Sequence, residues 1–251
     1  MIKTNKIKVG AVSYLNTKPL LYGLYKSSLI QQIKLVEEYP SKIAEDLLNG
    51  NIDLGLVPVA IIPQLSQYYI ISEYCIGCDG EVASVALFSD VPIYKIENLL
   101  LDYQSKTSVM LTKILLKYFW KINPLLVPAN EHFIDNIKGS TAALIIGDRA
   151  FEQRSKYKYI YDLGSAWKQY SGLPFVFAAW IANKPLPSEF MNAFSKANAQ
   201  GLNHLEEIVA SLNYPHYNLK QYYTKNIQFK LGENMLNGLN KFLDILKQEP
   251  I

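Results

Sequence analysis

The first 57 residues alternate between short apolar segments and amphipathic segments, and no other feature limits the fold as strongly. Lys6–Val12, Ile33–Tyr39 and Ile52–Val57 are rich in β-branched and apolar residues, which predicts strands. The segments that begin near Thr17 and at Ser41 carry apolar residues at helical spacing, and each begins with a residue that can cap a helix. Strand–helix–strand–helix–strand predicts βαβ units and a parallel sheet.

A second set of the same kind follows. Its expected strands and helices are, in order, Glu81–Phe88, Leu99–Asp102, a helix over Thr107–Trp120, Leu125–Val127, a helix from Asn130 to Gly139, and Ala142–Ile146. An aromatic stretch (Tyr157–Gly172) and an apolar strand (Phe175–Ile181) come next. Two closing helices, Ser188–Asn213 and Glu233–Lys247, complete the chain.

These two sets predict an α/β fold of two lobes. We expect the chain to cross from one lobe to the other near Val82–Phe88 and to return near Phe175–Ile181. Residues 1–88 plus 178–251 would then form a discontinuous first lobe, and residues 89–177 the second. Folds of this kind bind small ligands in the cleft between the lobes, where strand ends and helix N-termini point.

Length, charge and hydropathy exclude several classes of protein. The chain has 251 residues, which suits one large domain or two modest lobes. Its net charge of +3 is too small for a nucleic-acid footprint. The longest apolar stretches fall far short of the ~20 residues of a transmembrane helix. Met1–Lys6 leads straight into a strand with no apolar secretory region, so we expect a cytoplasmic protein that binds neither membrane nor nucleic acid.

Motifs for nucleotide, metal or hydrolytic chemistry are missing from the sequence, which argues against a nucleotide cofactor and a hydrolytic triad. Cys75 and Cys78 have the spacing of a redox dithiol or half a zinc site. The three histidines are scattered, however, and Asp79-Gly80 is a turn signal rather than a helix start. We therefore favour two reduced thiols near a turn.

Polar residues at two helix starts are the best candidates for a site. Ser13-Tyr14-Leu15-Asn16-Thr17 lies between the first strand and the first helix, and Ser105-Lys106-Thr107-Ser108 opens a helix of the second lobe. Both segments could simply cap their helices. Facing each other across a cleft, the two N-termini would suit a dicarboxylate.

Three further features allow two interpretations. Ser84, in an apolar strand, could be a small core residue or a site residue at the crossing between lobes. Asp148-Arg149 could clamp a carboxylate, but Glu152 and Arg154 nearby favour a solvated charge run. The aromatic residues between 167 and 180 suit the core, although one or two could cover an unsaturated ring.

Several motifs together resemble the chorismate dehydratases of the futalosine pathway to menaquinone. They are SYLNT at 13–17, DLGLVPV at 53–59, YCIG at 74–77 with VASV at 82–85, LIIGD at 144–148 and SGLPFVFA at 171–178. They occur in order and cover most of the chain. The resemblance implies a periplasmic-binding-protein type II fold used as a cofactor-free lyase that converts chorismate to 3-[(1-carboxyvinyl)oxy]benzoate and water.

The resemblance also implies site residues. Asn16 and Ser84 match the residues most often implicated in catalysis in that family. As substrate-binding residues we expect Ser13, Tyr14, Thr17, Ser105, Thr107 and Ser108. Arg149 departs from the small residue expected after Gly-Asp and is left out.

Elimination of water from chorismate needs positioning and a modest base. We expect the enolpyruvyl carboxylate of the substrate itself to take the C3 proton, Asn16 to orient that carboxylate or the leaving hydroxyl, and Ser84 to hydrogen-bond the ring carboxylate. The alternatives are a 1,4-dihydroxy-6-naphthoate synthase-like sister enzyme of the same fold, or a non-catalytic carboxylate-binding protein. A regulator's sensing domain fits less well, since no DNA-binding segment is evident.

Overall fold

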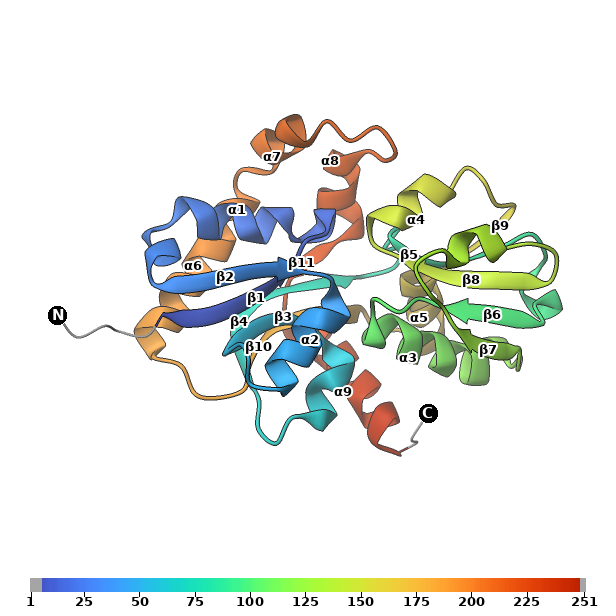
Figure 1. The fold of residues 1–251 in the computed structure, drawn as a ribbon, viewed down its shortest axis with the longest axis horizontal. Helices are drawn as coiled ribbons and strands as arrows, with labels where there is room; N and C mark the ends of the chain where they lie inside the picture. The colour runs from blue at the N-terminus through green and yellow to red at the C-terminus, as the bar shows by residue number, and fades with distance from the viewer. Residues whose placement is uncertain (1–5, 249–251) are drawn as a thin grey trace.

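A computed structural model of the chain describes residues 6–248, and within them the strands form two sheets in two lobes that lie side by side (Figure 1). The first sheet has the order β11-β4-β10-β3-β1-β2. Its strands are β1 (Ile7–Val12), β2 (Ile33–Glu38), β3 (Leu54–Pro58), β4 (Tyr69–Cys78), β10 (Phe175–Ala182) and β11 (Gln228–Lys230). β1 runs parallel to β2 and β3, as the βαβ pattern predicts, whereas β10 runs antiparallel between β3 and β4.

The second sheet has the order β7-β6-β8-β5-β9. Its strands are β5 (Val85–Ser89), β6 (Asn98–Leu101), β7 (Leu125–Pro128), β8 (Thr141–Ile146) and β9 (Tyr159–Asp162). β6 is parallel to β7 and β8, and β5 is antiparallel to β8 and β9. The two sheets confirm the two-lobed α/β class expected from the sequence.

Helices cover both sheets. They are α1 (Lys18–Lys26), α2 (Pro40–Leu48), α3 (Lys106–Ile114), α4 (Asp148–Gln153), α5 (Leu163–Ser171), α6 (Ser188–Leu202), α7 (Leu205–Leu212), α8 (Leu219–Gln221) and α9 (Glu233–Gln248). No helix of the described part is long and apolar enough to span a membrane. α1 and α6 touch backbone to backbone, because a Cβ on Gly23 would overlap the Ala197 carbonyl and a Cβ on Gly201 would overlap that of Pro19.

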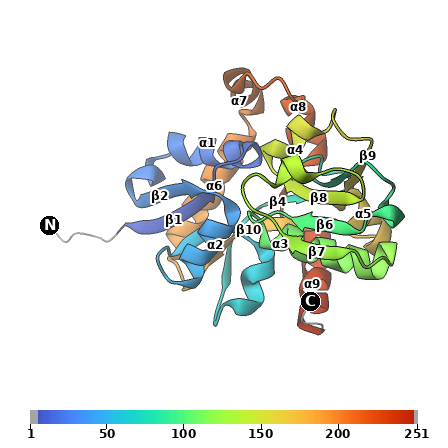
Figure 2. The same cartoon turned by 45° about the vertical axis from the view of Figure 1, so that its right-hand side comes forward.

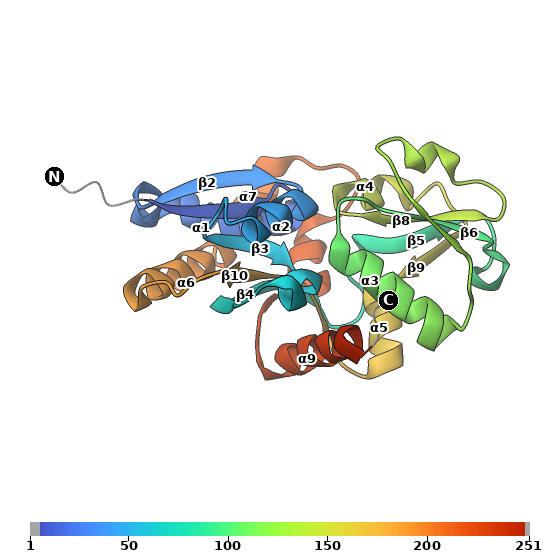
Figure 3. The ribbon, with the colours of Figure 1, turned by 60° about the horizontal axis from the view of Figure 1, so that its bottom comes forward.

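The last helix, α9, packs beneath the junction of the two lobes (Figure 3). Phe242 lies 5.0 Å from Phe175 of β10 and 6.2 Å from Trp167 of α5, measured between ring centroids. Both contacts are edge-to-face, an arrangement that adds to the gain from apolar burial. The prediction that the closing helices pack back on the first lobe is therefore confirmed for α9, which also reaches the second lobe.

The chain crosses between the sheets before β5 and before β10. The lobe boundaries expected from the sequence, at 88/89 and 177/178, each fall inside one of these strands. A strand is hydrogen-bonded along its length into one sheet, so it cannot be shared in this way. We therefore propose boundaries near residues 84 and 174, which leave β5 wholly in the second lobe and β10 wholly in the first.

Several local predictions were wrong. The expected strand β5 begins at Val85 rather than Glu81, and the expected helix from Asn130 to Gly139 is only a 3-10 turn at Phe133–Asn136. That segment is short and consists mostly of weak helix formers. The expected helix over Ser188–Asn213 is interrupted between α6 and α7, where Asn203 ends α6.

Other elements had not been expected at all. The second half of β4 is buried on both faces, so its sequence lacks the alternation of a half-buried strand. Its Cys75 and Cys78 are buried free thiols, as expected, and burial raises the pKa of each. The aromatic stretch supplies β9 and α5, and α8 continues into a π-helix, Tyr222–Asn226.

Candidate functional site

A cavity lies between the two lobes, at the carboxyl ends of the first-sheet strands and the start of α3. It is lined by Val12, Tyr14, Asn16, Thr17, Pro40, Pro58, Ile76, Val82, Ser84, Val85, Ser105, Ser108, Ile146, Gly147, Phe177 and Ala178. Its volume is about 40 Å³, against roughly 300 Å³ for the smallest ordinary ligand pockets. In this arrangement the lobes are therefore closed on the cavity and leave no room for a ligand of ordinary size.

The loop after β1 brings Tyr14, Asn16 and Thr17 to this cavity. Both backbone polar groups of Leu15, within this loop, are hydrogen-bonded to other parts of the chain. The Leu15 N–H donates to the Asp148 carboxylate, at 3.0 and 3.3 Å from the two oxygens, and the Tyr223 hydroxyl donates to the Leu15 carbonyl at 2.9 Å. The loop is consequently held by α4 of the second lobe and by the π-helix near the C-terminus.

Asn16 is oriented by its neighbour rather than used as a cap. The Thr17 hydroxyl donates to Asn16 Oδ1 at 3.0 Å. Thr17 occupies the N-cap position of α1 but makes no side-chain capping bond. With its carbonyl oxygen so engaged, Asn16 presents its NH₂ group as a donor near the cavity, which suits an anionic or hydroxyl ligand.

Ser84 reaches the cavity from the crossing segment just before β5. Ala83 has a φ of 66°, an uncommon conformation for a residue with a side chain. The Asp162 carboxylate compensates by accepting the N–H groups of Val82 and Ala83, at 3.1 and 2.8 Å. This bend places the buried Ser84 at the cavity wall. Of the two interpretations of Ser84, this position favours the site residue over the small core residue.

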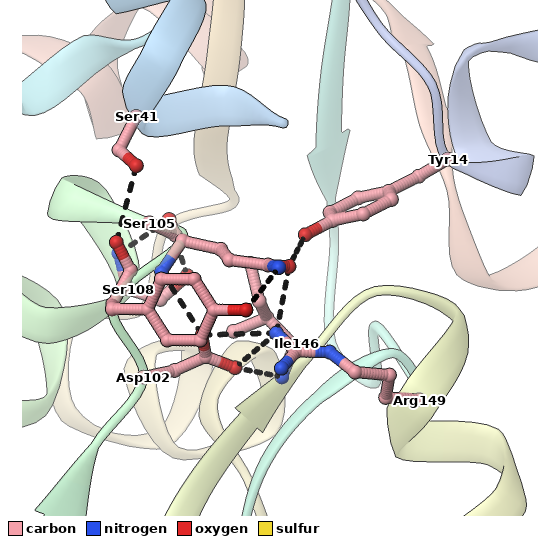
Figure 4. Close-up of polar contacts among 9 residues, drawn as sticks. Tyr14, Ser41, Asp102, Ser105, Ser108, Ile146 and Arg149 are labelled. Carbon is pink, nitrogen blue, oxygen red and sulfur yellow. Dashed lines mark hydrogen bonds and ion pairs between the residues drawn. The ribbon is translucent and has the colours of Figure 1, made fainter. Parts of the chain in front are cut away.

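The start of α3 contributes two hydroxyls. Ser105 Oγ accepts from the Ser108 N–H at 3.2 Å and lies 3.0 Å from Ser108 Oγ, so Ser105 caps the helix. Both serines also line the cavity. Figure 2 shows α3 at the junction of the two lobes, and Figure 4 labels the two serines. Thr107 does not: its hydroxyl accepts from the Ala60 N–H at 3.1 Å. Ser13 is exposed and is not among the lining residues either.

Two polar bridges connect the lobes beside the cavity (Figure 4). The Tyr14 hydroxyl donates to Gln104 Oε1. On the other side, Ser41 donates from its N–H to the Gln104 carbonyl at 3.0 Å and from its hydroxyl to the Tyr103 carbonyl at 3.1 Å. These contacts exist only when the lobes are together, so Tyr14 and Ser41 stabilise the closed arrangement.

Arg149 contacts Gln104, the residue to which Tyr14 donates, and so stabilises the Tyr14–Gln104 bridge. The interpretation of Asp148-Arg149 as a solvated charge run was therefore wrong. Arg149 Nη2 lies 2.9 and 2.7 Å from the two oxygens of Asp102 and 2.8 Å from Gln104 Oε1. The Asp102 side chain is fully buried. Burial alone would lower the pKa of the Arg149 guanidinium, but the Asp102 carboxylate holds it above its ordinary value.

Gly147, directly after β8 in the second lobe, lies against the Tyr14 ring of the first lobe. Its φ of 66° with ψ of −150° belongs to a region that glycine alone adopts readily. A Cβ at this position would lie 2.7 Å from Cε2 of the Tyr14 ring. Gly147 therefore leaves room for Tyr14 in the closed arrangement.

The pKa of the Asp148 carboxyl differs from its ordinary value. Burial raises the pKa of its carboxyl to about 6, although the N–H of Leu15 opposes the shift. The unfolded-state pKa is about 3.9. The acid form thus favours folding, and this contribution is lost as the pH rises through 6.

Replacing Asp148 by asparagine keeps an acceptor for Leu15 and removes the buried charge. We expect the unfolding free energy of Asp148→Asn minus that of the unchanged chain to rise by about 2 kcal/mol between pH 4 and pH 7, most of the full effect of about two pKa units at 1.36 kcal/mol each. Urea unfolding at each pH measures it. Asp90→Asn, at an exposed position, is the matched control and should show no comparable rise. A difference for Asp148→Asn that is independent of pH would refute the assignment.

The described lining of the cavity is neutral. Among the lining residues, all within the described chain, there is no histidine, cysteine, lysine, arginine, aspartate or glutamate. Nor do residues 6–248 contain a cluster of three His, Cys, Asp or Glu side chains that could hold a metal ion. The available groups are hydroxyls, one amide and backbone N–H groups, which bind and orient anions.

Comparison with known proteins identifies the family. A model of a family described as menaquinone biosynthesis matches residues 7–248. The chain belongs to this family. Among its relatives, a chorismate dehydratase of Thermus thermophilus is 26% identical over 95% of this chain and 94% of its own length. A chorismate dehydratase of Campylobacter jejuni is 28% identical over 74% of this chain and 73% of its own length.

Solved structures agree on the fold. A protein of Archaeoglobus fulgidus superposes with a TM-score of 0.76 at 14% identity, covering 98% of both chains. A Candida albicans protein described as having the generic periplasmic binding protein fold gives a TM-score of 0.63 at 12% identity, covering 98% of this chain and 91% of its own. The family member described here therefore has a periplasmic-binding-protein-like fold.

Proposed function

We propose that this protein is a chorismate dehydratase, which eliminates water from chorismate to give 3-[(1-carboxyvinyl)oxy]benzoate. The observation that carries the proposal is the cavity between the lobes, where neutral donors from both lobes converge and no charged side chain of the described lining intrudes. Chorismate carries two carboxylates and no phosphate, so such a site can bind it. The two relatives named chorismate dehydratase support the same substrate.

The proposed reaction relies mainly on the chemistry of chorismate itself. The C3 proton is vinylogous to the ring carboxylate, so its removal places negative charge on that carboxylate. The electron pair then expels the C4 hydroxyl, and aromatisation of the ring drives the step. The departing hydroxide takes up the proton that left C3, so one water is lost overall. Since the lining offers no titratable base of ordinary strength, the enolpyruvyl carboxylate of the substrate serves as the proton carrier.

Each lobe would contribute to positioning. Asn16 orients the enolpyruvyl carboxylate or the leaving hydroxyl with its NH₂ group, and Ser84 donates to the ring carboxylate. Tyr14, Thr17, Ser105 and Ser108 complete the binding surface from the two lobes. Ser13 and Thr107 lie outside the lining and would contribute only indirectly. The cytoplasmic location expected from the sequence stays a prediction.

The test is direct. Purified, chelator-treated protein is mixed with chorismate, and the products are separated by chromatography and identified by mass. We expect one product lighter than chorismate by one water. Chorismate bound but unchanged would instead favour a carboxylate-binding protein. Release of dihydroxynaphthoate from a cyclic futalosine, with chorismate untouched, would favour the sister enzyme.

A further inference from the structure

One buried hydroxyl stands directly behind Ser84. Tyr222, the first residue of the π-helix Tyr222–Asn226, is 1% exposed, and its hydroxyl lies 2.7 Å from Ser84 Oγ. Ser84 lines the cavity whereas Tyr222 does not. Tyr222 therefore acts on a bound ligand through the cavity residues that it contacts, of which Ser84 is the one it donates to.

The direction of this hydrogen bond decides what Ser84 can do. A phenol is far more acidic than an aliphatic hydroxyl, so it is the better donor of the two. Burial raises the pKa of Tyr222 well above its ordinary value, so the phenol keeps its proton. When Ser84 Oγ accepts from Tyr222, its own O–H is left to donate elsewhere, and the cavity lies on its free side.

Asn16 approaches the same phenol. Its side chain acts on Tyr222 in the sense that lowers the pKa, as an N–H donor to the phenol oxygen does. The Thr17 hydroxyl already occupies Asn16 Oδ1. The Thr17–Asn16 and Tyr222–Ser84 hydrogen bonds thus lie beside each other, and Thr17, Asn16 and Ser84 all line the cavity.

We propose that Tyr222 is a positioning residue that fixes Ser84 as a hydrogen-bond donor to the carboxylate of the substrate ring. This inference rests on the proposed function. As the C3 proton leaves, negative charge grows on that carboxylate, so a donor already aimed at it stabilises the transition state more than the ground state. The effect of Tyr222 should therefore appear mainly in kcat.

Neighbouring residues fix the positions of Tyr222 and Ser84 relative to each other. The Tyr222 ring packs edge-on against Phe151, with centroids 4.9 Å apart. Asn226, four residues further along the π-helix, donates from Nδ2 to the Glu81 carbonyl at 3.1 Å. That bond ties the π-helix to the segment that leads into Ser84, and π-helices often occur at functional sites.

The experiment uses Tyr222→Phe, Ser84→Ala and the double variant, each assayed with chorismate over a range of concentrations. We expect Tyr222→Phe to lower kcat about 10-fold with KM changed less than about 3-fold, a loss confined to the transition state. Since Tyr222 acts through Ser84, the double variant should be no slower than Ser84→Ala alone. Tyr157→Phe, which removes a hydroxyl that contacts the Ile134 carbonyl far from the cavity, is the matched control.

Two outcomes would overturn the inference while leaving the proposed function intact. Tyr222→Phe with unchanged kcat is one. The other is a double variant slower than Ser84→Ala by the full factor of Tyr222→Phe, which would indicate a merely structural role. If the unchanged protein binds chorismate in calorimetry but does not turn it over, the proposed function fails, and the inference that rests on it fails with it.

Discussion

Asn16→Asp is expected to lower kcat/KM for chorismate at neutral pH by at least about 100-fold. The substitution replaces a donor NH₂ by a carboxylate where the substrate presents carboxylates of its own. Two like charges about 4 Å apart repel by roughly 4 kcal/mol at an effective dielectric constant of about 20, equivalent to about three orders of magnitude.

The pH profile distinguishes this repulsion from a general loss of structure. The substrate's charge raises the pKa of the new carboxyl, and the protonated acid can donate as the amide did. Activity of Asn16→Asp should therefore recover in part as the pH falls, whereas a damaged fold would not recover. Asn123→Asp makes the same change of charge at an exposed position of the second lobe. If Asn16→Asp turned over chorismate as fast as that control, the role assigned to Asn16 would be wrong.

Local signals in the sequence were enough for much of the site. The alternation of strands and helices predicted both lobes, and the capping pattern placed Ser105 and Ser108 at the start of α3, where they line the cavity. Asn16 and Ser84 came from motifs in the sequence, and both line the same cavity. Each of these inferences needs only residues close together in the chain.

The residues that the sequence did not reveal act across long separations. Tyr222 meets Ser84 over 138 residues, and Arg149 meets Asp102 over 47. No spacing rule links such positions, because only the packing of the two lobes brings them together. The one signal available was the run of tyrosines that ends in Tyr222 and Tyr223, which is more aromatic than a surface loop requires.

The other missed residue, Asp148, shows a different limit. Its LIIGD motif was noticed, but the charges that follow suggested exposure. In the fold, Glu152 lies at the surface, while Asp148 turns under the Leu15 loop. Burial of an individual side chain depends on what the other lobe places over it, and a charge pattern within one helix carries no information on that.

Arg149→Met is expected to have the largest effect on stability, about 3–5 kcal/mol of unfolding free energy at neutral pH. The Asp102 side chain is fully buried, and without its partner it keeps only the N–H groups of Gln104 and Ile146, at 3.0 and 3.1 Å. The buried carboxyl must then either stay charged without its partner or take up a proton, and both alternatives cost stability. Urea unfolding followed by circular dichroism measures the loss.

The double variant Asp102→Asn/Arg149→Met separates the cost of the orphaned charge from the loss of packing. Removing both charges should restore at least half of the stability, because a buried ion pair is itself close to neutral once its desolvation is counted. Lys168→Met, which breaks the exposed pair with Asp79, should cost no more than about 1 kcal/mol. If the single and double variants were equally unstable, the orphaned charge of Asp102 would not be the cause of the lost stability. Arg149 would then stabilise the fold through its packing and through its hydrogen bond to Gln104.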